Sequence, residues 1–488
     1  MTDAIASADV GQSRGDQPTL VKDGMGLRGS VIFAMSGAAP GQTIAITLAL
    51  LVATAAYATI LPMIITTAGL LCIAVSFHRL NMWRQNAGAT YNWVARSVNP
   101  YLGYMVGWLM LVAFGGFVLI DVITIGPSVL SLLGLSPSNQ LASALAIVII
   151  GSLLTTTAVV GLRPSARLQL TVGLIEYSIL LVFIVWAFIA VYIVHASGTV
   201  SPTIHWLSFA GDGGSFSASM IIAVAAVAGW DAGIYVNEET ARPEKNPGLG
   251  AVIGVALIGF LFITMFATFQ GVGSFSDLQA NAANGAAFVG QRLGGTAGNK
   301  IISLAVVLSV LGTTQVAIIG TSRLIYSMSR DKVLTPRLGR ISRRFRTPAF
   351  ATTLLGGVMI LFGVIDIYQS SVATAIADLI AVSGFLYAAF YAITGLAAAW
   401  VYRRFILRSA KDALILGLMP LAGAGLLLWV GENGAVNLTT PERFILIGLG
   451  VLGIVLMIIA AKRYKAPIFR TKVEAAKTDQ ATLHVGAD

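Results

Sequence analysis

The sequence predicts an all-α membrane protein with twelve transmembrane helices, and three observations lead to this fold class. Of the 488 residues, 56% are hydrophobic and only 11% are charged, about half the charged fraction of an average soluble domain. Apolar runs of about 20 residues, the length that crosses a bilayer, recur along nearly the whole chain. The basic residues also gather in every second loop between these runs, which places nearly all of them on one side of the membrane. The lipid bilayer is therefore the first partner that the sequence predicts.

The apolar runs give twelve spans in chain order. The stretch from Val31 to Phe77 carries no charge, so it is divided on its length and on the Ala-Tyr-Ala-Thr sequence around residue 57. The predicted spans are 30–54, 58–80, 100–133, 140–161, 166–195, 215–238, 247–272, 299–328, 348–367, 371–401, 412–431 and 443–462.

The distribution of Lys and Arg tests this count independently. With both termini placed in the cytoplasm, all 31 Lys and Arg except Arg292, Lys300 and Arg443 fall on the cytoplasmic side, as the positive-inside rule requires. The net charge of +10 belongs mainly to cytoplasmic loops such as 330–346, so it needs no nucleic-acid groove to explain it. We predict a multi-pass protein of the plasma (inner) membrane that binds no nucleic acid.

The first predicted span contains an interruption, Ser-Gly-Ala-Ala-Pro-Gly. Pro40 lacks an amide proton and disfavours helix at Ala39, while the neighbouring glycines allow the backbone to turn. The amides freed there, at the start of a second half-helix, would suit a carboxylate, and free carbonyl groups would suit an ammonium group. A proline kink in a packed helix is the alternative. The predicted substrate-binding residues of this break are Ser36, Gly37, Ala38, Ala39, Gly41 and Gln42.

The sixth predicted span is interrupted at mid-membrane depth, where Gly229 and Gly233 bracket Trp230 and Asp231. Unwound backbone is tolerated in a membrane only where it is buried in protein or lines a cavity, and ionisable residues at this depth mark functional sites. We therefore predict that Gly229, Trp230 and Asp231 bind substrate, with Trp230 covering it. A structural kink around a shielded acid is the alternative.

The two interruptions suggest an internal repeat. Five spans separate them, and an odd number of crossings reverses direction, so the two units would be inverted, as in several transporter folds. An amphipathic stretch precedes the third span (88–98), and another precedes the eighth (283–293). The predicted organisation is a cytoplasmic tail (1–28), a first five-helix unit (29–195), a second inverted unit (215–405), two further helices (406–463) and a second cytoplasmic tail (464–488).

Several other polar residues lie inside predicted spans. Glu176 is surrounded by apolar residues, where a titratable carboxyl could carry a coupling proton, or a protonated one could bond a neighbouring helix. Asp121 either attracts a substrate amine or pairs with a polar group in an outer vestibule. In the eighth span, Thr313, Thr314 and Gln315 could line the site or hold an ion, although a threonine in a membrane helix more often bonds its own backbone. Tyr387 and Tyr391, four residues apart, either gate the site or pack.

Several chemistries are disfavoured. A single cysteine, Cys72, permits neither an internal disulfide nor a thiolate metal cluster, and the four histidines lack metal-ligand spacing. The sequence contains no phosphate-binding loop, so direct use of ATP is not expected. The sequence also lacks a set of nucleophile, base and metal ligands, so a membrane enzyme is not expected. We therefore expect no catalytic residue, no metal site and no cofactor.

Several motifs, in this order, resemble those of the amino acid, polyamine and organocation (APC) superfamily, and they cover residues 29 to about 405. The Gly-Trp-Asp segment is followed by a polar stretch and a Pro-containing loop, and similar motifs lie around the third and eighth helices. These segments are Gly88–Tyr91, Tyr101–Tyr104, Gly107–Trp108, Gly229–Asp231, Asn237–Thr240, Arg242–Pro247, Thr321–Arg323, Met328–Asp331 and Thr347–Pro348.

The resemblance implies an amino acid permease with the five-plus-five inverted repeat of the sodium-coupled leucine transporter, discontinuous helices 1 and 6, and two additional C-terminal helices. It implies a substrate between helices 1, 3, 6, 8 and 10, with the carboxylate at Ser36–Gly41 and the second break at Gly229–Asp231. Similar proteins can carry a lysine near Glu176 that replaces a bound sodium ion. The sequence Ala38-Ala39-Pro40 departs from the usual Gly-Ser/Thr-Gly pattern, which narrows the pocket and leaves the substrate open.

The function expected is that of a secondary active transporter that moves an amino acid or related amine by alternating access. The coupling ion would be a proton carried by Glu176, with Na+ as the alternative. A polyamine or cationic amine carrier or exchanger is the second candidate, favoured by Asp121, Glu176 and Asp231. A potassium-type cation uptake system on the same fold is the third. The chain would act as a monomer or homodimer.

Overall fold

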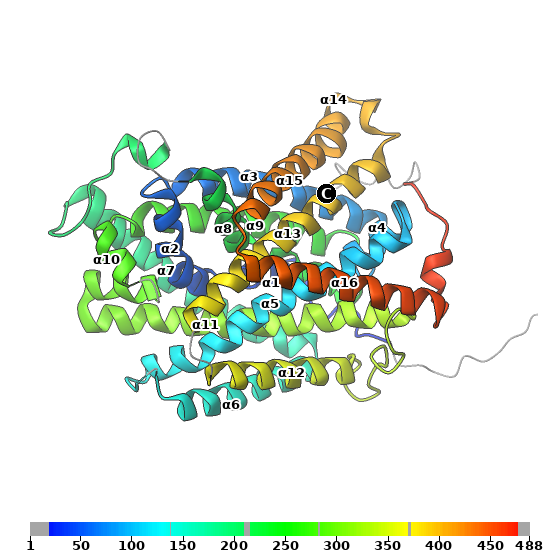
Figure 1. The fold of residues 1–488 in the computed structure, drawn as a ribbon, viewed down its shortest axis with the longest axis horizontal. Helices are drawn as coiled ribbons and strands as arrows, with labels where there is room; N and C mark the ends of the chain where they lie inside the picture. The colour runs from blue at the N-terminus through cyan, green and yellow to red at the C-terminus, as the bar shows by residue number, and fades with distance from the viewer. Residues whose placement is uncertain (1–18, 137, 209–214, 282–283, 369–371, 477–488) are drawn as a thin grey trace, which may run out of the picture.

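The computed structural model describes residues 19–136, 138–208, 215–281, 284–368 and 372–476. Over these residues the chain is helical, with one isolated β-bridge between Met25 and Thr240. Twelve helices are long and apolar enough to cross a membrane. Figure 1 shows most of them running side by side along the longest axis of the molecule. The prediction of an all-α protein with twelve candidate membrane spans is confirmed.

The described elements follow the predicted spans closely, with short helices between some of them. The main helices are α1 (Leu27–Gly37), α2 (Pro40–Ala55), α3 (Ile60–Trp83), α4 (Thr90–Ser97), α5 (Pro100–Leu132), α6 (Gln140–Val160), α7 (Leu162–Phe188), α8 (Phe216–Val227), α9 (Asn246–Phe269), α10 (Phe275–Ala280), α11 (Gly285–Arg330), α12 (Ala349–Ile367), α13 (Val372–Tyr402), α14 (Ala410–Asp412), α15 (Met419–Asn437) and α16 (Thr440–Lys462). The 3-10 segments are η2 (Ile204–Leu207), η3 (Trp230–Ile234), η4 (Asn237–Glu239), η6 (Ile406–Arg408) and η8 (Pro467–Arg470), and the π segments are η1 (Ile189–Ile193) and η7 (Ala413–Leu418).

Some segments differ in detail from the predicted boundaries. The amphipathic stretch predicted at 283–293 is helical from Gly285 and belongs to α11, which has non-helical backbone at Gly294 and Gly295 before the long apolar part begins; residue 283 lies outside the described residues. The short helix α10 was not predicted. Of the predicted tails, only residues 19–28 and 464–476 are described.

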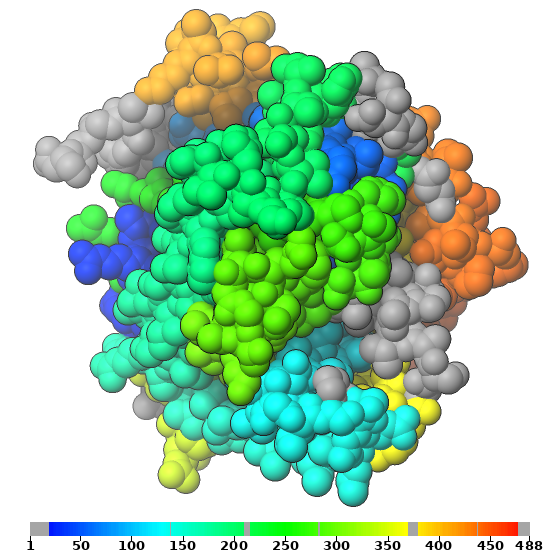
Figure 2. Space-filling model, turned by 90° about the vertical axis from the view of Figure 1, so that its left-hand side faces the viewer, coloured from blue at the N-terminus to red at the C-terminus, as the bar shows by residue number. Residues whose placement is uncertain are grey.

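The two ends of the bundle differ in charge. We call the end that holds the loop 331–347 the basic end; it lies to the right in Figure 1. Hydrogen bonds join this end to other segments: Arg346 to Thr19, Thr347 to Val159, and Arg330 to Glu238. Figure 2 shows the other end, where residues near 195–208 and 285–300 lie together. There the Arg292 guanidinium donates to the carbonyl oxygen of Gly198 at 3.0 Å.

The interrupted spans lie at the centre of the bundle. The buried share of the apolar window is 83% for Phe216–Ile234 and 78% for Leu27–Ala55, but only 11% for Thr440–Lys462. The first two spans are therefore surrounded by other helices, whereas α16 lies on the periphery, where lipid can cover it. This packing places both interruptions inside the protein, where irregular backbone can be tolerated.

Candidate functional site

The first interruption separates α1 from α2. Helix α1 ends at Gly37, Ala38 remains near helical geometry, and Ala39 adopts the left-handed conformation with φ 46° and ψ 61°. A residue with a Cβ seldom adopts this conformation. Helix α2 then begins with Pro40, whose missing amide proton costs nothing at a helix start. The chain is thus bent sharply at Ala39 in the middle of an apolar span.

Three amides of this first break, those of Ala38, Ala39 and Gly41, have acceptors in the structure. Ala38 donates to the carbonyl oxygen of Met35, and Ala39 donates to that of Ser36, each at 3.2 Å. The Gly41 amide lies 3.1 Å from Glu176 Oε1 and 3.1 Å from Ser309 Oγ. A carboxylate predicted to bind these amides would therefore have to displace existing hydrogen bonds.

The Glu176 carboxyl group lies beside the first turn of α2. The side chain comes from α7, is 1% exposed and accepts from the Gly41 amide, so it occupies the positive end of the α2 dipole. Ser309 of α11 interacts with the same carboxyl group. Three helices therefore meet at this carboxyl group. Ser309 was not singled out from the sequence, and its position four residues before Thr313 is the signal that could have found it.

The second interruption follows α8. Helix α8 ends at Val227, Ala228 is extended, and Gly229 has φ +91°, a conformation that favours glycine. The 3-10 segment η3 then carries Trp230 and Asp231, both 0% exposed. The Tyr391 hydroxyl donates to Asp231 Oδ1 at 2.7 Å and accepts from the Gly229 amide at 3.2 Å. Tyr391 therefore ties the break to α13.

The two interruptions touch each other through glycine backbone. A Cβ atom built on Gly37 would lie 2.2 Å from the carbonyl oxygen of Gly229, and a Cβ on Gly229 would lie equally close to that of Gly37. Any side chain at either position would force the two segments apart. Two breaks that are about 190 residues apart in the sequence thus form one structure at the centre of the protein.

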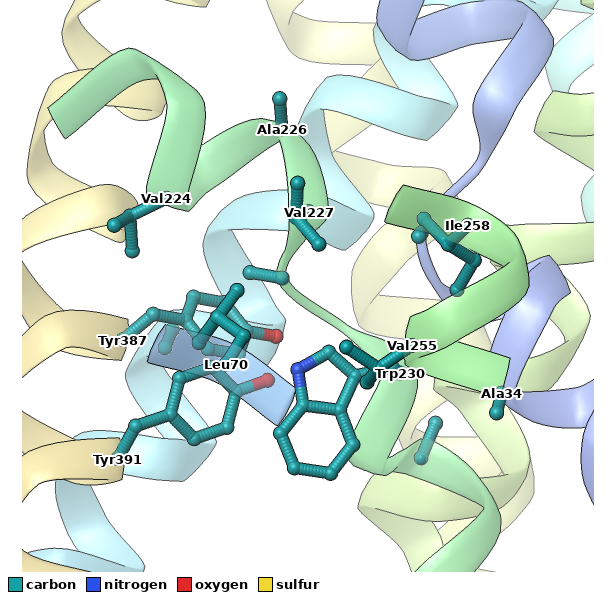
Figure 3. Packing of buried hydrophobic residues seen from close by; sticks show 14 of the residues in the cluster. Ala34, Leu70, Val224, Ala226, Val227, Trp230, Val255, Ile258, Tyr387 and Tyr391 are labelled. Carbon is teal, nitrogen blue, oxygen red and sulfur yellow. The ribbon is translucent and has the colours of Figure 1, made fainter. Parts of the chain in front are cut away.

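Aromatic side chains form one wall of this centre. The Trp230 ring stacks on Tyr391 with a centroid distance of 5.1 Å and meets the edge of Phe77 at 5.0 Å. Tyr387, one turn from Tyr391 on α13, lies 5.4 Å from the Tyr391 ring. Figure 3 shows the hydroxyl ends of Tyr387 and Tyr391 directed toward the Trp230 indole. Tyr387 and Tyr391 therefore belong to the same cluster as the second break.

Asp121 lies close to the same cluster. It comes from α5, is 1% exposed, and faces the side chains of Gln42 and Thr314. Tyr387 interacts electrostatically with both Asp121 and Asp231. The Thr314 hydroxyl donates to the Val310 carbonyl oxygen at 2.7 Å, the backbone bond that was the alternative for this residue. Tyr387 is thus close enough to both buried carboxyl groups to interact with them electrostatically.

The unpaired polar atoms of the centre are mostly hydrogen-bond acceptors. Among the described residues, Asp231 Oδ2, Asp121 Oδ2 and Gln42 Oε1 make no hydrogen bond, nor do the Tyr387 hydroxyl and the Trp230 indole nitrogen. Leaving such groups buried and unpaired costs free energy. A ligand that donates hydrogen bonds, such as an ammonium group, would satisfy the carboxylate and amide oxygens.

The predicted site residues thus fall into two connected groups. Ser36, Gly41 and Glu176 lie around the start of α2, while Gly229, Trp230 and Asp231 lie against α13. Gly37 and Gly229 join the groups. Gly37 is half-buried, and all other predicted site residues are buried. The buried residues are Ser36, Ala38, Ala39, Gly41, Gln42, Asp121, Glu176, Gly229, Trp230, Asp231 and Thr314.

The chain is similar to known permeases along most of its length. The amino acid permease family matches residues 29–460. The branched-chain amino acid permease BcaP of Bacillus subtilis is 25% identical over 296 residues, which cover 57% of this chain and 61% of the relative. The low-affinity putrescine importer PlaP of Escherichia coli K12 is 24% identical over 411 residues, which cover 82% of this chain and 85% of the relative.

A third relative extends the range of solutes among similar proteins. The methylthioribose transporter of Bacillus subtilis is 26% identical over 212 residues, which cover 42% of this chain and 43% of the relative. All three relatives are named as carriers of small molecules and none as an enzyme. With the family match spanning nearly the whole described chain and twelve candidate membrane spans, this multi-pass protein belongs to the amino acid permease family of the APC superfamily.

Proposed function

We propose that this chain is a secondary active transporter that moves an amino acid or a related amine by alternating access, with a proton as the coupling ion. The observation that carries the proposal is the contact of two helix breaks at Gly37 and Gly229, next to the buried carboxyl groups of Glu176 and Asp231. The match to the amino acid permease family and the names of the relatives support it.

The amine of the substrate would bind at Asp231. Its free Oδ2 atom can accept a hydrogen bond from an ammonium group. The rings of Trp230 and Tyr391 lie next to it, and aromatic faces attract cations. The aliphatic part of the substrate would then pack against the same rings.

The movement would be a rocking of the interrupted spans against the rest. We infer two inverted units, 29–195 and 215–405, in which the interrupted spans move together with α3 and α9. The basic end would face the cytoplasm, because cytoplasmic loops carry the excess of Lys and Arg. Both termini would then be cytoplasmic in the plasma (inner) membrane.

Ligand binding to the purified protein tests the proposal. We expect leucine, arginine or putrescine to raise the melting temperature, because a ligand that binds the folded state stabilises it by about 2.7 kcal/mol at a hundred times its Kd. The Nα-acetyl derivative of an active amino acid, or the N,N′-diacetyl derivative of putrescine, should have no effect, because it lacks the ammonium group that would bind Asp231. If no amine stabilises the protein, or if the acetylated form acts equally well, the proposal fails.

A diamine or polyamine is the second candidate substrate. The observation that favours it is the pair of buried carboxyl groups, Asp121 and Asp231, which both interact electrostatically with Tyr387 and each have an unpaired oxygen. Two acids would hold the two ammonium groups of a diamine, whereas the amides of Ala38, Ala39 and Gly41, which would bind a carboxylate, already have acceptors. Stronger binding of putrescine than of butylamine, which has one amine, would select this candidate.

We expect Glu176→Gln to remove the pH dependence of net uptake while substrate binding stays near the wild-type level. Glutamine keeps an oxygen that can accept from the Gly41 amide but cannot release a proton. Among the described neighbours, α2 and α11 present the uncharged Gly41 and Ser309 to this carboxyl group, and Tyr177 is the titratable group that interacts with it. Uptake into proteoliposomes at acidic and neutral external pH measures the effect.

Glu442→Gln is the matched control for this variant. Glu442 is also a largely buried glutamate that accepts from a backbone amide at a helix start, but it lies on α16. Its replacement should leave the pH profile unchanged. If Glu176→Gln retains the wild-type profile, Glu176 is not the proton carrier.

A further inference from the structure

A stripe of buried polar side chains runs from Glu176 toward the basic end. On α7 it consists of Ser165, Gln169 and Glu176, which are 0%, 1% and 1% exposed. Their spacing of four and seven residues places them on one face of the helix. The other faces of α7 carry exposed apolar residues such as Leu174 and Val182. The polar face is therefore turned into the protein and away from lipid.

Helix α11 faces this stripe with polar groups of its own. The Gln169 amide donates to the Gly312 carbonyl oxygen at 2.8 Å and to Gln315 Oε1 at 3.4 Å. The Gln315 amide in turn donates to Ser165 Oγ and to Thr157 Oγ1, each at 3.0 Å. Gln169 and Gln315 thus connect α7, α11 and α6 in one network.

The network reaches the loop between α6 and α7. The Ser165 hydroxyl donates to the Gly161 carbonyl oxygen at 2.9 Å. Nearby, Thr347 donates to the Val159 carbonyl oxygen at 2.7 Å, so this loop lies beside the loop 331–347 of the basic end. One end of the polar stripe is therefore close to the surface that carries most of the positive charge.

Near the other end of the network, Thr313 joins α11 to Ser36 and lies one helical turn from Ser309, which interacts with the Glu176 carboxyl group. The Thr313 hydroxyl donates to the Ser36 carbonyl oxygen at 2.7 Å and to that of Ser309 at 3.0 Å. A Cβ atom built on Gly312 would lie 3.2 Å from Gln169 Oε1 and 3.8 Å from Ser36 Oγ. Because Gly312 has no side chain, the Gln169 amide and the Ser36 hydroxyl can both lie close to the α11 backbone at this position.

Two buried atoms along the stripe have no hydrogen-bond partner among the described residues. They are Gln169 Oε1 and the Tyr177 hydroxyl oxygen. A purely structural network would be expected to satisfy its members, because unpaired polar groups in an apolar span are costly. Unpaired acceptors are, however, suitable for a proton that passes along the stripe with water.

We propose that the stripe formed by Gln169, Gln315 and Ser165 is the route by which the proton leaves Glu176 for the basic end of the protein. This inference rests on the proposed proton coupling. The Glu176 carboxyl group loses its proton and becomes a carboxylate, which the Gly41 amide and the Ser309 hydroxyl continue to bind. Water held by the hydroxyl and amide groups of the stripe takes up this proton and passes it to water at the Gly161 loop, so that each side chain of the stripe keeps its own protons.

The neighbouring helices place few charges near this route. Helices α6 and α9, which pack against α7, contain no charged residue, and α1 carries only Arg28, in its first turn. Helix α11 carries four basic residues, of which the buried Arg323 is paired with Glu239; they are Arg292, Lys300, Arg323 and Arg330. Arg163 and Arg167 of α7 are exposed and lie on other faces than Gln169. Tyr177 is the titratable group adjacent to Glu176.

The test compares net uptake with counterflow in proteoliposomes that contain Gln169→Met. Net uptake requires the proton to leave on the inside, whereas exchange of labelled for unlabelled substrate lets the carrier return with its proton bound. We expect net uptake to fall roughly tenfold, the effect of about 1.4 kcal/mol on a barrier. Counterflow and the melting-temperature shift produced by substrate should stay at the wild-type level. Gln315→Met interrupts the same route and should behave alike, which keeps the test valid if one variant does not fold.

Gln270→Met is the matched control. Gln270 is also fully buried, accepts one hydrogen bond from Thr59, and has one unpaired amide atom, but it lies at the end of α9. It should retain net uptake. Equal losses of net uptake and counterflow in Gln169→Met and Gln315→Met would overturn the proposed route. If the wild-type protein moves no proton with its substrate, the coupling itself is wrong, and the route falls with it.

Discussion

Asp231→Asn is expected to reduce substrate uptake roughly a hundredfold while the protein remains folded. Asparagine has nearly the same shape, and its oxygen can still accept from the Tyr391 hydroxyl, which bonds Asp231 Oδ1 at 2.7 Å. What is lost is the negative charge opposite a substrate ammonium group. Removing one partner of a buried charge pair costs about 3 kcal/mol, which corresponds to roughly a hundredfold in binding.

The measurement combines initial uptake rates with size-exclusion profiles and melting temperatures. Asp366→Asn is a suitable control, because Asp366 is a half-buried acid near the end of α12 and lies outside the candidate site. It should transport like the wild-type protein. Wild-type rates in Asp231→Asn would show that the acid only stabilises the break and does not bind substrate.

The helical spans could be predicted because each depends on a local property of the sequence. A run of apolar residues long enough to cross a bilayer must form a helix there, since its backbone can bond only to itself. Even the uncharged stretch Val31–Phe77 was divided close to the end of α2 at Ala55 and the start of α3 at Ile60. The short helix α10 was missed because six residues with mixed polarity leave no periodic signal.

The partners of the buried polar residues could not be predicted in the same way. The bond between Tyr391 and Asp231 joins residues 160 apart in the chain, and that between Gly41 and Glu176 joins residues 135 apart. Such pairs are set by how the helices pack, which hydropathy does not specify. The sequence could nevertheless indicate that Glu176 and Asp231 need partners, because neither can reach water from mid-span.

Arg323→Leu is expected to destabilise the protein by about 3–5 kcal/mol, the usual cost of removing one partner from a buried ion pair. Arg323 of α11 bonds Glu239 of η4 through two nitrogen–oxygen contacts of 2.8 and 3.2 Å, and both side chains are 0% exposed. The substitution leaves the Glu239 carboxylate buried and without its cation. Thermal or denaturant unfolding of the purified protein in detergent measures the loss.

The neighbouring pair provides the matched comparison. Arg330 and Glu238 also join α11 to η4, at 2.8 Å, but their side chains are 38% and 23% exposed, so Arg330→Leu should cost no more than about 1 kcal/mol. A double variant, Arg323→Leu with Glu239→Leu, should recover much of the stability that Arg323→Leu loses, because no charge is then left unpaired. Equal effects of Arg323→Leu and Arg330→Leu would mean that water reaches Glu239 and that the pair is not the buried connection between η4 and α11 that the geometry indicates. The double variant could also recover its stability without recovering transport. That result would show that transport needs the two charges themselves, for the movement of η4 relative to α11, and not only the stability that they provide.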